Sequence, residues 1–257
     1  MLNIVVPMAG AGSRFAKAGF QTPKPLIPVR GVPMIRLVIE NVRPQREHRF
    51  IFVVQEAHDL EYGLAQQLAA WAGSNTAIVR VNGLTEGAAC TVLAGAQWFD
   101  SSDPLMIVNS DQWVDASIDD YLRRADGFQD GLIMTMQADD PKWSFVGLTP
   151  DGRVTRVVEK EVISDMATVG IYNFARGADF VAGARDMIAA NERVNGEFYV
   201  APVYNRLIRK GAEIGSFSIG READGMYGLG IPADLELFLS LPVSDKALAP
   251  FLEQEAA

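Results

Sequence analysis

The stretch that decides the fold is Leu2-Asn3-Ile4-Val5-Val6-Pro7, followed at once by Met8-Ala9-Gly10-Ala11-Gly12-Ser13-Arg14. The first part, at 2–6, is a short apolar run with β-branched residues, which is typical of a buried strand. The second part is a loop of small residues that contains two glycines. A glycine loop can point its backbone amides inward and hold phosphate oxygens. The N-terminus therefore predicts a strand that presents a phosphate-binding loop.

Apolar segments of strand length and helix length alternate through the first half of the chain. Strands are predicted at 49–54, 76–81 and 105–108. Helices are predicted at 33–42, 60–71 and 87–99. Strands that alternate with helices form a parallel sheet with helices on both faces.

After residue 130 the pattern changes to strands joined by turns. Strands are predicted at 131–137, 144–148, 154–158 and 168–174, and helices at 177–190, 202–210 and 232–241. We therefore expect an α/β fold, with a Rossmann-like sheet that is mixed but mostly parallel and is flanked by helices. No linker-like or charge-rich segment divides the 257 residues, so we expect one domain.

The composition argues against several classes of protein. The chain has 257 residues, of which 49% are hydrophobic, so it can bury a large core. Its net charge of −9 disfavours nucleic acid as a partner, because nucleic-acid-binding surfaces carry a basic excess. One cysteine, Cys90, and two histidines, His48 and His58, disfavour internal disulfides and a zinc cluster. With no signal-like or membrane-spanning apolar run, we expect a cytoplasmic protein without a membrane partner.

A lysine flanked by prolines, in Pro23-Lys24-Pro25-Leu26, follows the glycine loop. The prolines restrict the backbone around Lys24, and Arg14 adds a forked cation that suits phosphate. The alternative is an ordinary glycine turn beside an exposed lysine. Two other phosphate motifs do not match, because the dinucleotide fingerprint requires a glycine at Phe15 and the P-loop requires Gly-Lys-Ser/Thr. The combination favours phosphate binding over an ordinary turn.

The stretch Ala9–Phe15, together with Pro23–Leu26, resembles the signature of the sugar-phosphate nucleotidyltransferases. Glucose-1-phosphate thymidylyltransferases and uridylyltransferases are familiar members. The resemblance implies an enzyme that moves a nucleoside monophosphate from a nucleoside triphosphate to a sugar 1-phosphate and releases pyrophosphate. Such enzymes serve nucleotide-sugar and cell-surface polysaccharide biosynthesis. It also implies a nucleotide-binding half at about 1–130, a substrate-binding half at about 131–240 and a C-terminal helix.

The resemblance assigns the triphosphate to the first loop. Arg14 and Lys24 are implied as catalytic cations, and Lys24 would stabilise the α-phosphate as it gains charge. The implied nucleotide-binding residues of this loop are Ala9, Gly10, Gly12 and Ser13.

A second loop, Gly83–Ala89, opens a predicted helix. Free amides at a helix N-terminus suit the edge of a base or a phosphate. By resemblance, Glu86, Gly87 and Ala88 face the nucleobase. The small residues resemble those of pyrimidine-using members, whereas Glu86 is unlike the thymidylyl-transferring ones. A plain helix cap with a glycine turn explains the loop equally well.

A carboxylate, Asp111 of Asn109-Ser110-Asp111, ends the strand predicted at 105–108. Ligands gather at the carboxyl ends of parallel strands, and Mg²⁺ accepts one or two carboxylates together with phosphate oxygens. By resemblance, Asp111 is the metal ligand and belongs to the catalytic set, with Mg²⁺ as cofactor. The alternative is an aspartate in a turn.

The acceptor substrate is assigned to the second half by the same resemblance. Lys160 would hold the substrate's own phosphate, and Glu159 would hold a sugar hydroxyl. The implied substrate-binding residues are Glu159, Lys160, Thr168, Gly170 and Glu197. The alternatives are a solvated charge pair at 159–160 and an ordinary loop before a helix at Glu197.

The sequence departs from the family late in the chain. Most members carry a second metal-binding aspartate there, and Gly228 stands at the matching position. Asp224 lies four residues earlier, which is about 13 Å along a strand at roughly 3.3 Å per residue. We therefore expect Asp111, phosphate oxygens and waters to complete the metal site.

Several alternatives stay open at the level of the sequence. A phosphate oxygen is already a nucleophile, so the transfer needs no general base, which fits a chain without a candidate catalytic His or Cys. Alternatives are a cytidylyltransferase acting on a non-sugar phosphorylated small molecule, a dinucleotide-dependent oxidoreductase, and a regulatory module that binds a nucleotide without turnover. Leu248, Phe251 and Leu252 could dock on their own domain or form a homo-oligomer contact.

Overall fold

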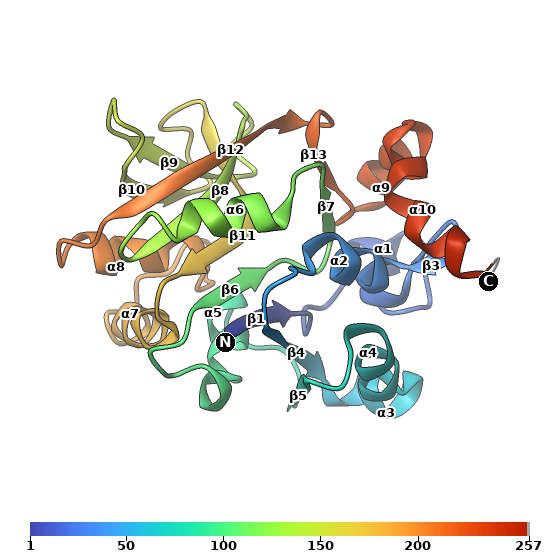
Figure 1. Cartoon of the computed structure of the whole chain (residues 1–257). Coiled ribbons are helices and arrows are strands. Elements are labelled where there is room, and N and C mark those ends of the chain that lie inside the picture. The colour runs from blue at the N-terminus through green and yellow to red at the C-terminus, as the bar shows by residue number, and fades with distance from the viewer. Residues whose placement is uncertain (256–257) are drawn as a thin grey trace.

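The computed structural model describes residues 1–255, and the side chains of residues 1–252. Its frame is an 11-stranded mixed sheet with helices packed on both sides (Figure 1). The strand β1, Leu2–Pro7, lies inside this sheet, and its side chains alternate between the two faces. Ile4 and Val6 belong to the core on one side, and Val5 to the core on the other. This double burial explains why the strand is apolar without interruption.

The first half of the chain forms the parallel part of the sheet. The strand β1 lies between β4, His48–Gln55, and β6, Leu105–Val108, and β5, Thr76–Val81, lies beyond β4. All four strands run in the same direction. The carboxyl ends of β1 and β6 therefore bring the glycine loop and the segment around Asp111 to the same edge of the sheet.

Two predicted helices of this half are shorter than expected. The helix predicted at 60–71 is divided into α3, Glu56–Tyr62, and α4, Leu64–Ala72, because Gly63 takes a left-handed conformation with φ of +62°. The helix predicted at 87–99 is only α5, Ala88–Leu93, followed by a 3₁₀ turn at Ala96–Trp98. Gly95 separates the two pieces, and glycine is a poor residue for a helix interior. The helix α2, Met34–Val42, forms as predicted.

The second half continues the same sheet in mixed directions. The strand β11, Met166–Phe174, is antiparallel to both β6 and β8, Gly131–Gln137, so it joins the two halves. The strand β9, Ser144–Leu148, pairs with β11 and with β10, Val154–Glu159. These four strands follow the sequence predictions closely.

Other strands of the sheet come from segments that the sequence did not predict. The strand β12, Ile214–Glu222, runs parallel to β8, and β13, Gly225–Gly228, pairs antiparallel with β7, Gln112–Val114. β7 and β13 are short and are formed by pairing across more than 100 residues of sequence, so local pattern carries little sign of them.

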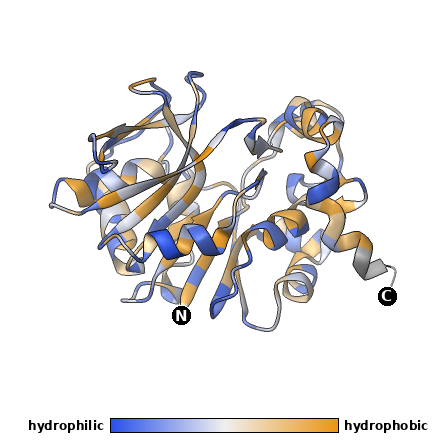
Figure 2. Cartoon of the chain, turned by 45° about the horizontal axis from the view of Figure 1, so that its top comes forward, coloured by the Kyte–Doolittle hydropathy of each residue, from blue (hydrophilic) through white to orange (hydrophobic). Residues whose placement is uncertain are grey.

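Helices cover the sheet of the second half. The helix α6, Ile118–Ala125, was not predicted, and Figure 2 shows its hydrophilic side turned away from the strands. The helix α7, Gly177–Ala189, forms as predicted. The helix predicted at 202–210 is the 3₁₀ turn Ala201–Val203 followed by α8, Tyr204–Ile208.

The C-terminal helices lie beside the N-terminal elements (Figure 1). They are α9, Pro232–Ser240, and α10, Val243–Glu255. Their apolar side chains share one cluster with Phe15 of α1, Ser13–Lys17, and with Ile27, which follows the 3₁₀ turn η1, Lys24–Leu26. Leu248 and Phe251 are buried in this cluster, so they dock on their own chain, whereas Leu252 is 64% exposed. The C-terminal helices therefore pack against the segments that follow the glycine loop.

Candidate active site

The glycine loop adopts a backbone that its glycines permit. Gly12 has φ of +59°, in the left-handed region, and the first turn of α1 begins at the next residue. A Cβ on Gly12 would lie 3.4 Å from the Cβ of Lys24, so the loop and the proline-flanked lysine are packed together. Arg14 is exposed and makes no hydrogen bond or ion pair within the described residues. Its guanidinium is free to meet an anionic ligand.

Lys24 and Asp111 form an ion pair at the edge of the sheet. The Lys24 Nζ donates to Asp111 Oδ2 at 2.8 Å, and both side chains are about one quarter exposed, at 23% and 27%. The backbone of Asp111 is also fixed, since its carbonyl oxygen accepts from the amide of Leu229 at 2.8 Å. The structure thus brings the two strongest candidates of the sequence, 87 residues apart, into direct contact.

Four cavities meet around this ion pair. The central cavity is lined by Met8, Gly10, Lys24, Ala88, Asn109 and Asp111, among others. It shares Gly10 and Lys24 with the loop cavity, which extends past Gly12 to His58 and Tyr62. It shares Gly10 and Ala88 with the α5 cavity, and Ala88 and Asn109 with the β11 cavity. Each holds about 210 to 300 Å³, so the ligand space is a branched cleft with Asp111 at its junction.

The α5 cavity is lined by Ala9, Leu84, Thr85, Gly87, Ala88, Thr91 and Glu197, among others. Gly87 is required here, because a Cβ in its place would lie 2.5 Å from the backbone N and O of Phe198, and its φ is +129°. Hydrogen bonds from Phe198 N to the Glu86 carbonyl and from Ala89 N to the Phe198 carbonyl lock the two segments together at 2.9 and 3.0 Å. The side chain of Glu86 does not line the cavity and instead pairs with Arg193.

The β11 cavity contains a buried carboxylate. Glu159 is 9% exposed and accepts a hydrogen bond from Ser144 Oγ. Burial raises the pKa of the Glu159 carboxyl, while the Ser144 hydrogen bond and the charge of Lys160 oppose this shift. The remaining walls are mainly aromatic or small, from Trp143, Thr168, Val169, Gly170, Tyr172, Tyr199, Val200 and Ala201. A carboxylate among aromatic rings suits a ligand that has hydroxyl or N–H groups to donate hydrogen bonds.

Lys160 lies next to this cavity but does not line it. Its φ of +59° is unusual for a residue with a side chain, and its amide is held by the carbonyl of Trp143 at 3.0 Å. Its Nζ donates to the Tyr199 hydroxyl at 2.7 Å, and this hydrogen bond raises the pKa of Lys160, which keeps it charged. Lys142 does line the cavity, and it pairs with Glu222 at 2.6 Å. Lys142 was not among the predicted site residues, because nothing in its local sequence distinguishes it from a surface lysine.

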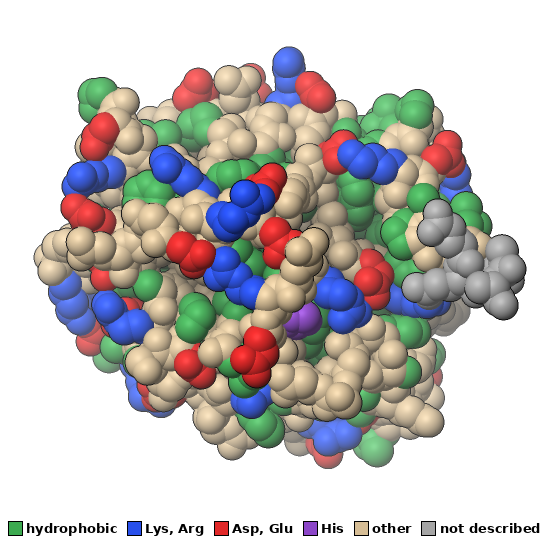
Figure 3. Space-filling view, in the orientation of Figure 1, with side chains coloured by type: hydrophobic (Ala, Val, Ile, Leu, Met, Phe, Trp, Pro, Cys, Tyr) green, Lys and Arg blue, Asp and Glu red, His purple; other side chains and the backbone are tan. Residues whose placement is uncertain are grey.

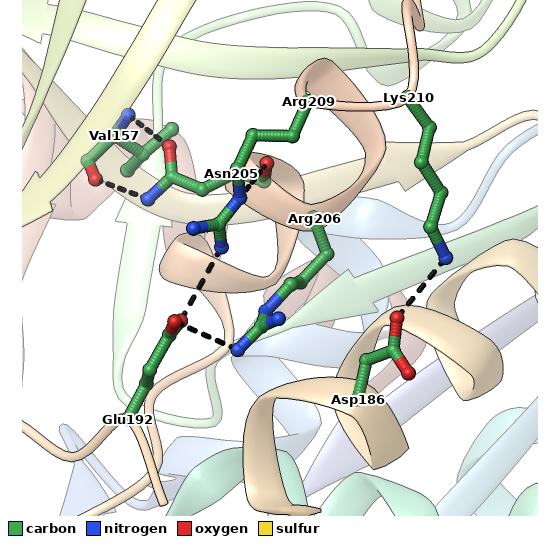
Figure 4. A network of polar contacts seen from close by, with 7 residues as sticks. All are labelled: Val157, Asp186, Glu192, Asn205, Arg206, Arg209 and Lys210. Atoms are coloured by element: carbon green, nitrogen blue, oxygen red, sulfur yellow. Dashed lines mark hydrogen bonds and ion pairs between the residues drawn. The ribbon is translucent and has the colours of Figure 1, made fainter. Parts of the chain in front are cut away.

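A side-chain amide holds the strand that carries Glu159. Asn205 of α8 accepts from Val157 N at 2.8 Å and donates to Val157 O at 2.7 Å, so it replaces a neighbouring strand at that point of β10 (Figure 4). Ion pairs anchor α8 in turn, from Arg206 to Glu192 and from Lys210 to Asp186. Asn205 therefore positions the end of β10, and its role was not visible in the sequence.

Gly170 permits the close approach of Asn109 to β11. Its φ is +81°, and a Cβ there would lie 2.2 Å from Asn109 Nδ2. The backbone N–H of Asn109 also donates to the Gly170 carbonyl at 2.9 Å. The two halves of the chain thus meet between the central and β11 cavities, where Asn109 packs on the backbone of Gly170.

Two further carboxylates lie near the late strand. Asp224 is an exposed residue, with a side chain 74% exposed and paired with Arg221, and it does not line the cleft. Asp234 of α9 is half-buried, and burial raises the pKa of its carboxyl. Asp111 and Glu222 also raise this pKa, whereas Lys142 and Arg14 lower it. Charged side chains of both signs gather near the middle of the face in Figure 3.

The model of the nucleotidyl transferase family matches residues 4–195, from β1 to beyond α7. This chain belongs to the nucleotidyl transferase family. The nucleoside-diphosphate-sugar pyrophosphorylase from Vibrio cholerae RC9, whose crystal structure is known, is 28% identical to this chain, with a TM-score of 0.78 over 93% of this chain and 100% of its own.

Other known proteins are similar to this chain in sequence or in fold. The bifunctional protein GlmU of Burkholderia multivorans is 28% identical over 257 residues, which cover 96% of this chain and 54% of GlmU. The chain therefore spans about half the length of the curated relatives it matches. The inositol-1-phosphate CTP transferase of T. maritima has the same fold, with a TM-score of 0.72 at 17% identity over 96% of both chains. The predicted family, fold class and class of enzyme are confirmed.

No helix among residues 1–255 combines the length and the apolar character needed to cross a membrane.

Proposed function

We propose that this nucleotidyl transferase moves a nucleoside monophosphate from a nucleoside triphosphate to the phosphate group of a sugar 1-phosphate and releases pyrophosphate. The observation that carries the proposal is the Lys24–Asp111 pair at the junction of the cleft. A cation and a carboxylate at this point would lie between a ligand bound to the first half of the chain and one bound to the second half. We further propose one domain, with the nucleotide held by residues of 1–130 and the acceptor by residues of 131–240.

The cleft offers a place for each part of the substrates. The loop cavity, with Gly10, Gly12 and Lys24, suits the triphosphate, since backbone amides and a lysine bind phosphate oxygens. The α5 cavity suits the base, and its small residues Gly87 and Ala88 favour a pyrimidine. The β11 cavity suits the acceptor, whose hydroxyls would meet Glu159. The Lys160 ammonium would break its hydrogen bond to the Tyr199 hydroxyl and bind the acceptor phosphate instead.

The transfer is an in-line displacement. An oxygen of the acceptor phosphate attacks the α-phosphorus, the bond to the bridging oxygen breaks, and pyrophosphate leaves with that electron pair. Two anions must be brought together, so the protein supplies position and positive charge. Lys24 would exchange Asp111 for the α-phosphate, and Arg14, which has no partner within the described residues, would hold the leaving phosphates.

The residues around Asp111 fit a Mg²⁺ ion. A Cβ on Gly230 would lie 2.6 Å from Asp111 Oδ2, so glycine keeps space open beside this carboxylate. The described residues contain no group of three or more His, Cys, Asp or Glu that could hold a metal, so phosphate oxygens and waters would provide most ligands. When bound, Mg²⁺ would neutralise phosphate charge and orient the triphosphate.

We propose that the reaction takes place in the cytoplasm and that its nucleotide-sugar product is used to make cell-surface polysaccharide. The net charge of −9 disfavours nucleic acid as a partner, so local cations would have to hold the small anionic substrates. A non-sugar acceptor with a cytidine donor is the second candidate, because the aromatic walls around Glu159 accept any compact hydroxyl-bearing ring.

The test is a pyrophosphate-release screen of all common nucleoside triphosphates against sugar 1-phosphates and non-sugar phosphates, with and without Mg²⁺. We expect release only when Mg²⁺, a pyrimidine triphosphate and a phosphorylated acceptor are present together. Robust hydrolysis of triphosphate without an acceptor would overturn the proposal, because water would then be the nucleophile. Bound nucleotide without any release would favour a regulatory module.

A further inference from the structure

We propose that the side-chain amide of Asn109 is a further catalytic residue, which binds the acceptor phosphate and directs one of its oxygens at the α-phosphorus. This inference rests on the proposed function, because it concerns the reaction between the two phosphates. Asn109 was not among the predicted site residues, although it lies two residues before Asp111.

The first support is the place of Asn109 in the cleft. The central cavity contains Lys24 and Asp111, and the β11 cavity contains Glu159. Among the described residues, Ala88 and Asn109 line both cavities, and of these two only Asn109 has a polar side chain. A transfer from a triphosphate in the central cavity to an acceptor in the β11 cavity places the reacting phosphates at this junction. The amide of Asn109 is therefore the polar side-chain group that both ligands would reach.

The second support is the lack of a protein partner for this amide. The Asn109 side chain is half-buried, and it makes no hydrogen bond within the part of the chain whose side chains are described. The amide of Gln112 lies beside the same glycine, because a Cβ on Gly170 would be 2.2 Å from Asn109 Nδ2 and 2.7 Å from Gln112 Oε1. The two amides do not bond to each other, and the buried Gln112 Nε2 has no protein partner either. A half-buried amide without a partner costs free energy, which a ligand with acceptor oxygens would recover.

The position of Asn109 is fixed by its backbone. It directly follows β6, and its N–H donates to the Gly170 carbonyl at 2.9 Å. Val108 before it pairs with Ile171 of β11, and Ser110 after it is buried. The amide therefore starts from a rigid strand end, and a group that orients a nucleophile has to be held in this way.

The proposed contact would set the orientation of the nucleophile. A phosphate monoester has three terminal oxygens, and one of them attacks. In the proposed arrangement Lys160 binds a second oxygen, and Asn109 Nδ2 donates a hydrogen bond to the third. With two oxygens held, the phosphate cannot rotate about its ester bond, and the remaining oxygen faces the α-phosphorus. Asn109 gives up no proton, and its neutral amide leaves the charge balance around Asp111 unchanged.

A purely structural role explains less of this geometry. Asn109 packs on the backbone of Gly170 where the two halves of the chain meet, and an apolar side chain of the same shape would pack there equally well. The four residues of β6 before it are apolar and fully buried, whereas Asn109 is polar and lines two cavities. A decisive test therefore removes the amide and keeps the shape.

Two substitutions meet this requirement. Asn109→Leu removes the N–H donors, and Asn109→Asp replaces the amide by a carboxylate that repels phosphate. We expect Asn109→Leu to lower kcat for pyrophosphate release by about a hundredfold, the scale of a misplaced reacting group. Calorimetry with the α,β-methylene analogue of the triphosphate, and urea unfolding, should give wild-type values. Asn75→Asp, at an exposed amide outside the cleft, is the matched control and should keep the wild-type kcat.

The pH dependence of Asn109→Asp adds a readout that packing alone would not change. When the introduced carboxyl is protonated, its O–H can donate to the acceptor phosphate as the amide does. The ratio of the variant's kcat to the wild-type kcat should therefore rise as the pH is lowered through the pKa of this carboxyl. Titration of the acceptor phosphate itself is common to both proteins and cancels in the ratio.

Three results would be decisive. Wild-type kcat in Asn109→Leu would overturn the role of Asn109 and leave the proposed function standing. Parallel losses of kcat, triphosphate affinity and stability in Asn109→Leu, with a kcat ratio for Asn109→Asp that is constant with pH, would show a structural role and also overturn the inference. Failure of the wild-type enzyme to release pyrophosphate with any donor and acceptor would instead overturn the proposed function.

Discussion

The two sides of Asp111 are built differently. On one side lies the loop from Gly10 to Lys24, which is contiguous in sequence and places Lys24 Nζ 2.8 Å from the carboxylate. On the other side lies the segment from Gly228 to Gly230, in which neither glycine has a side chain. The carboxylate close to Gly228 is that of Asp234, which belongs to the following helix, α9. The difference teaches that a loop proposed to bind phosphate needs a fixed local order, because its amides would act together. A carboxylate can come from any segment that reaches the same point in space.

The largest effect that would break this comparison is expected at Asp111. We predict that Asp111→Asn lowers kcat by about a thousandfold, the upper end for removal of one electrostatic group from a transition state. Asp224→Asn should change kcat little, because Asp224 is exposed and lies outside the cleft. Steady-state pyrophosphate release measures both. Severe losses in both variants, each relieved by more Mg²⁺, would show that Asp224 is a ligand after all.

Substitution of Lys24 and substitution of Lys160 should affect different kinetic constants. Lys24→Ala should lower kcat by about a hundredfold, because its charge acts mainly in the transition state. Lys160→Ala should raise KM for the acceptor by about tenfold or more, the loss of one charge-assisted hydrogen bond present in both states. Initial-rate kinetics with varied acceptor and varied triphosphate separates these. The reverse assignment would contradict the proposed arrangement of donor and acceptor.

Two glycines near the α5 cavity sharpen the comparison at the level of folding. Gly83 and Gly87 both have positive φ, but a Cβ meets nothing at Gly83 and meets the backbone of Phe198 at Gly87. Gly83→Ala should cost about 1 to 2 kcal/mol of stability, the cost of a left-handed alanine. Gly87→Ala should cost more, since backbone must also move. Urea unfolding gives both values, and equal costs would mean that the Phe198 contact is readily relaxed.

The smallest effect concerns the buried carboxylate. Burial raises the pKa of Glu159 above its ordinary 4.5, so the folded protein holds this proton more tightly than the unfolded chain. Wild-type stability should therefore fall as pH rises from about 4.5 through the raised pKa, whereas Glu159→Gln lacks this fall. Thermal unfolding at a series of pH values should show the variant gaining relative stability across that window. A difference that is constant with pH would mean that Glu159 does not titrate there.

Local sequence was a reliable guide where one segment carried the whole signal. The strands β1, β4, β5 and β6 are apolar runs of strand length and lie where they were predicted. The predicted helix at 60–71 failed at Gly63, whose left-handed backbone starts a new helix. The helix at 87–99 failed because Gly95 lies within it. In both cases the apolar spacing continued across a glycine at which the helix is interrupted.

By itself, the sequence determined the family, the parallel half of the fold and the position of the glycine loop, because each depends on residues close together in the chain. Tertiary structure decided which residues from distant segments meet. The contact of Lys24 with Asp111, the hold of Asn205 on Val157, and the approach of Asp234 to Gly228 all join separate elements. Such contacts depend on how helices pack on the sheet, and the spacing of residues along one segment carries no record of that packing.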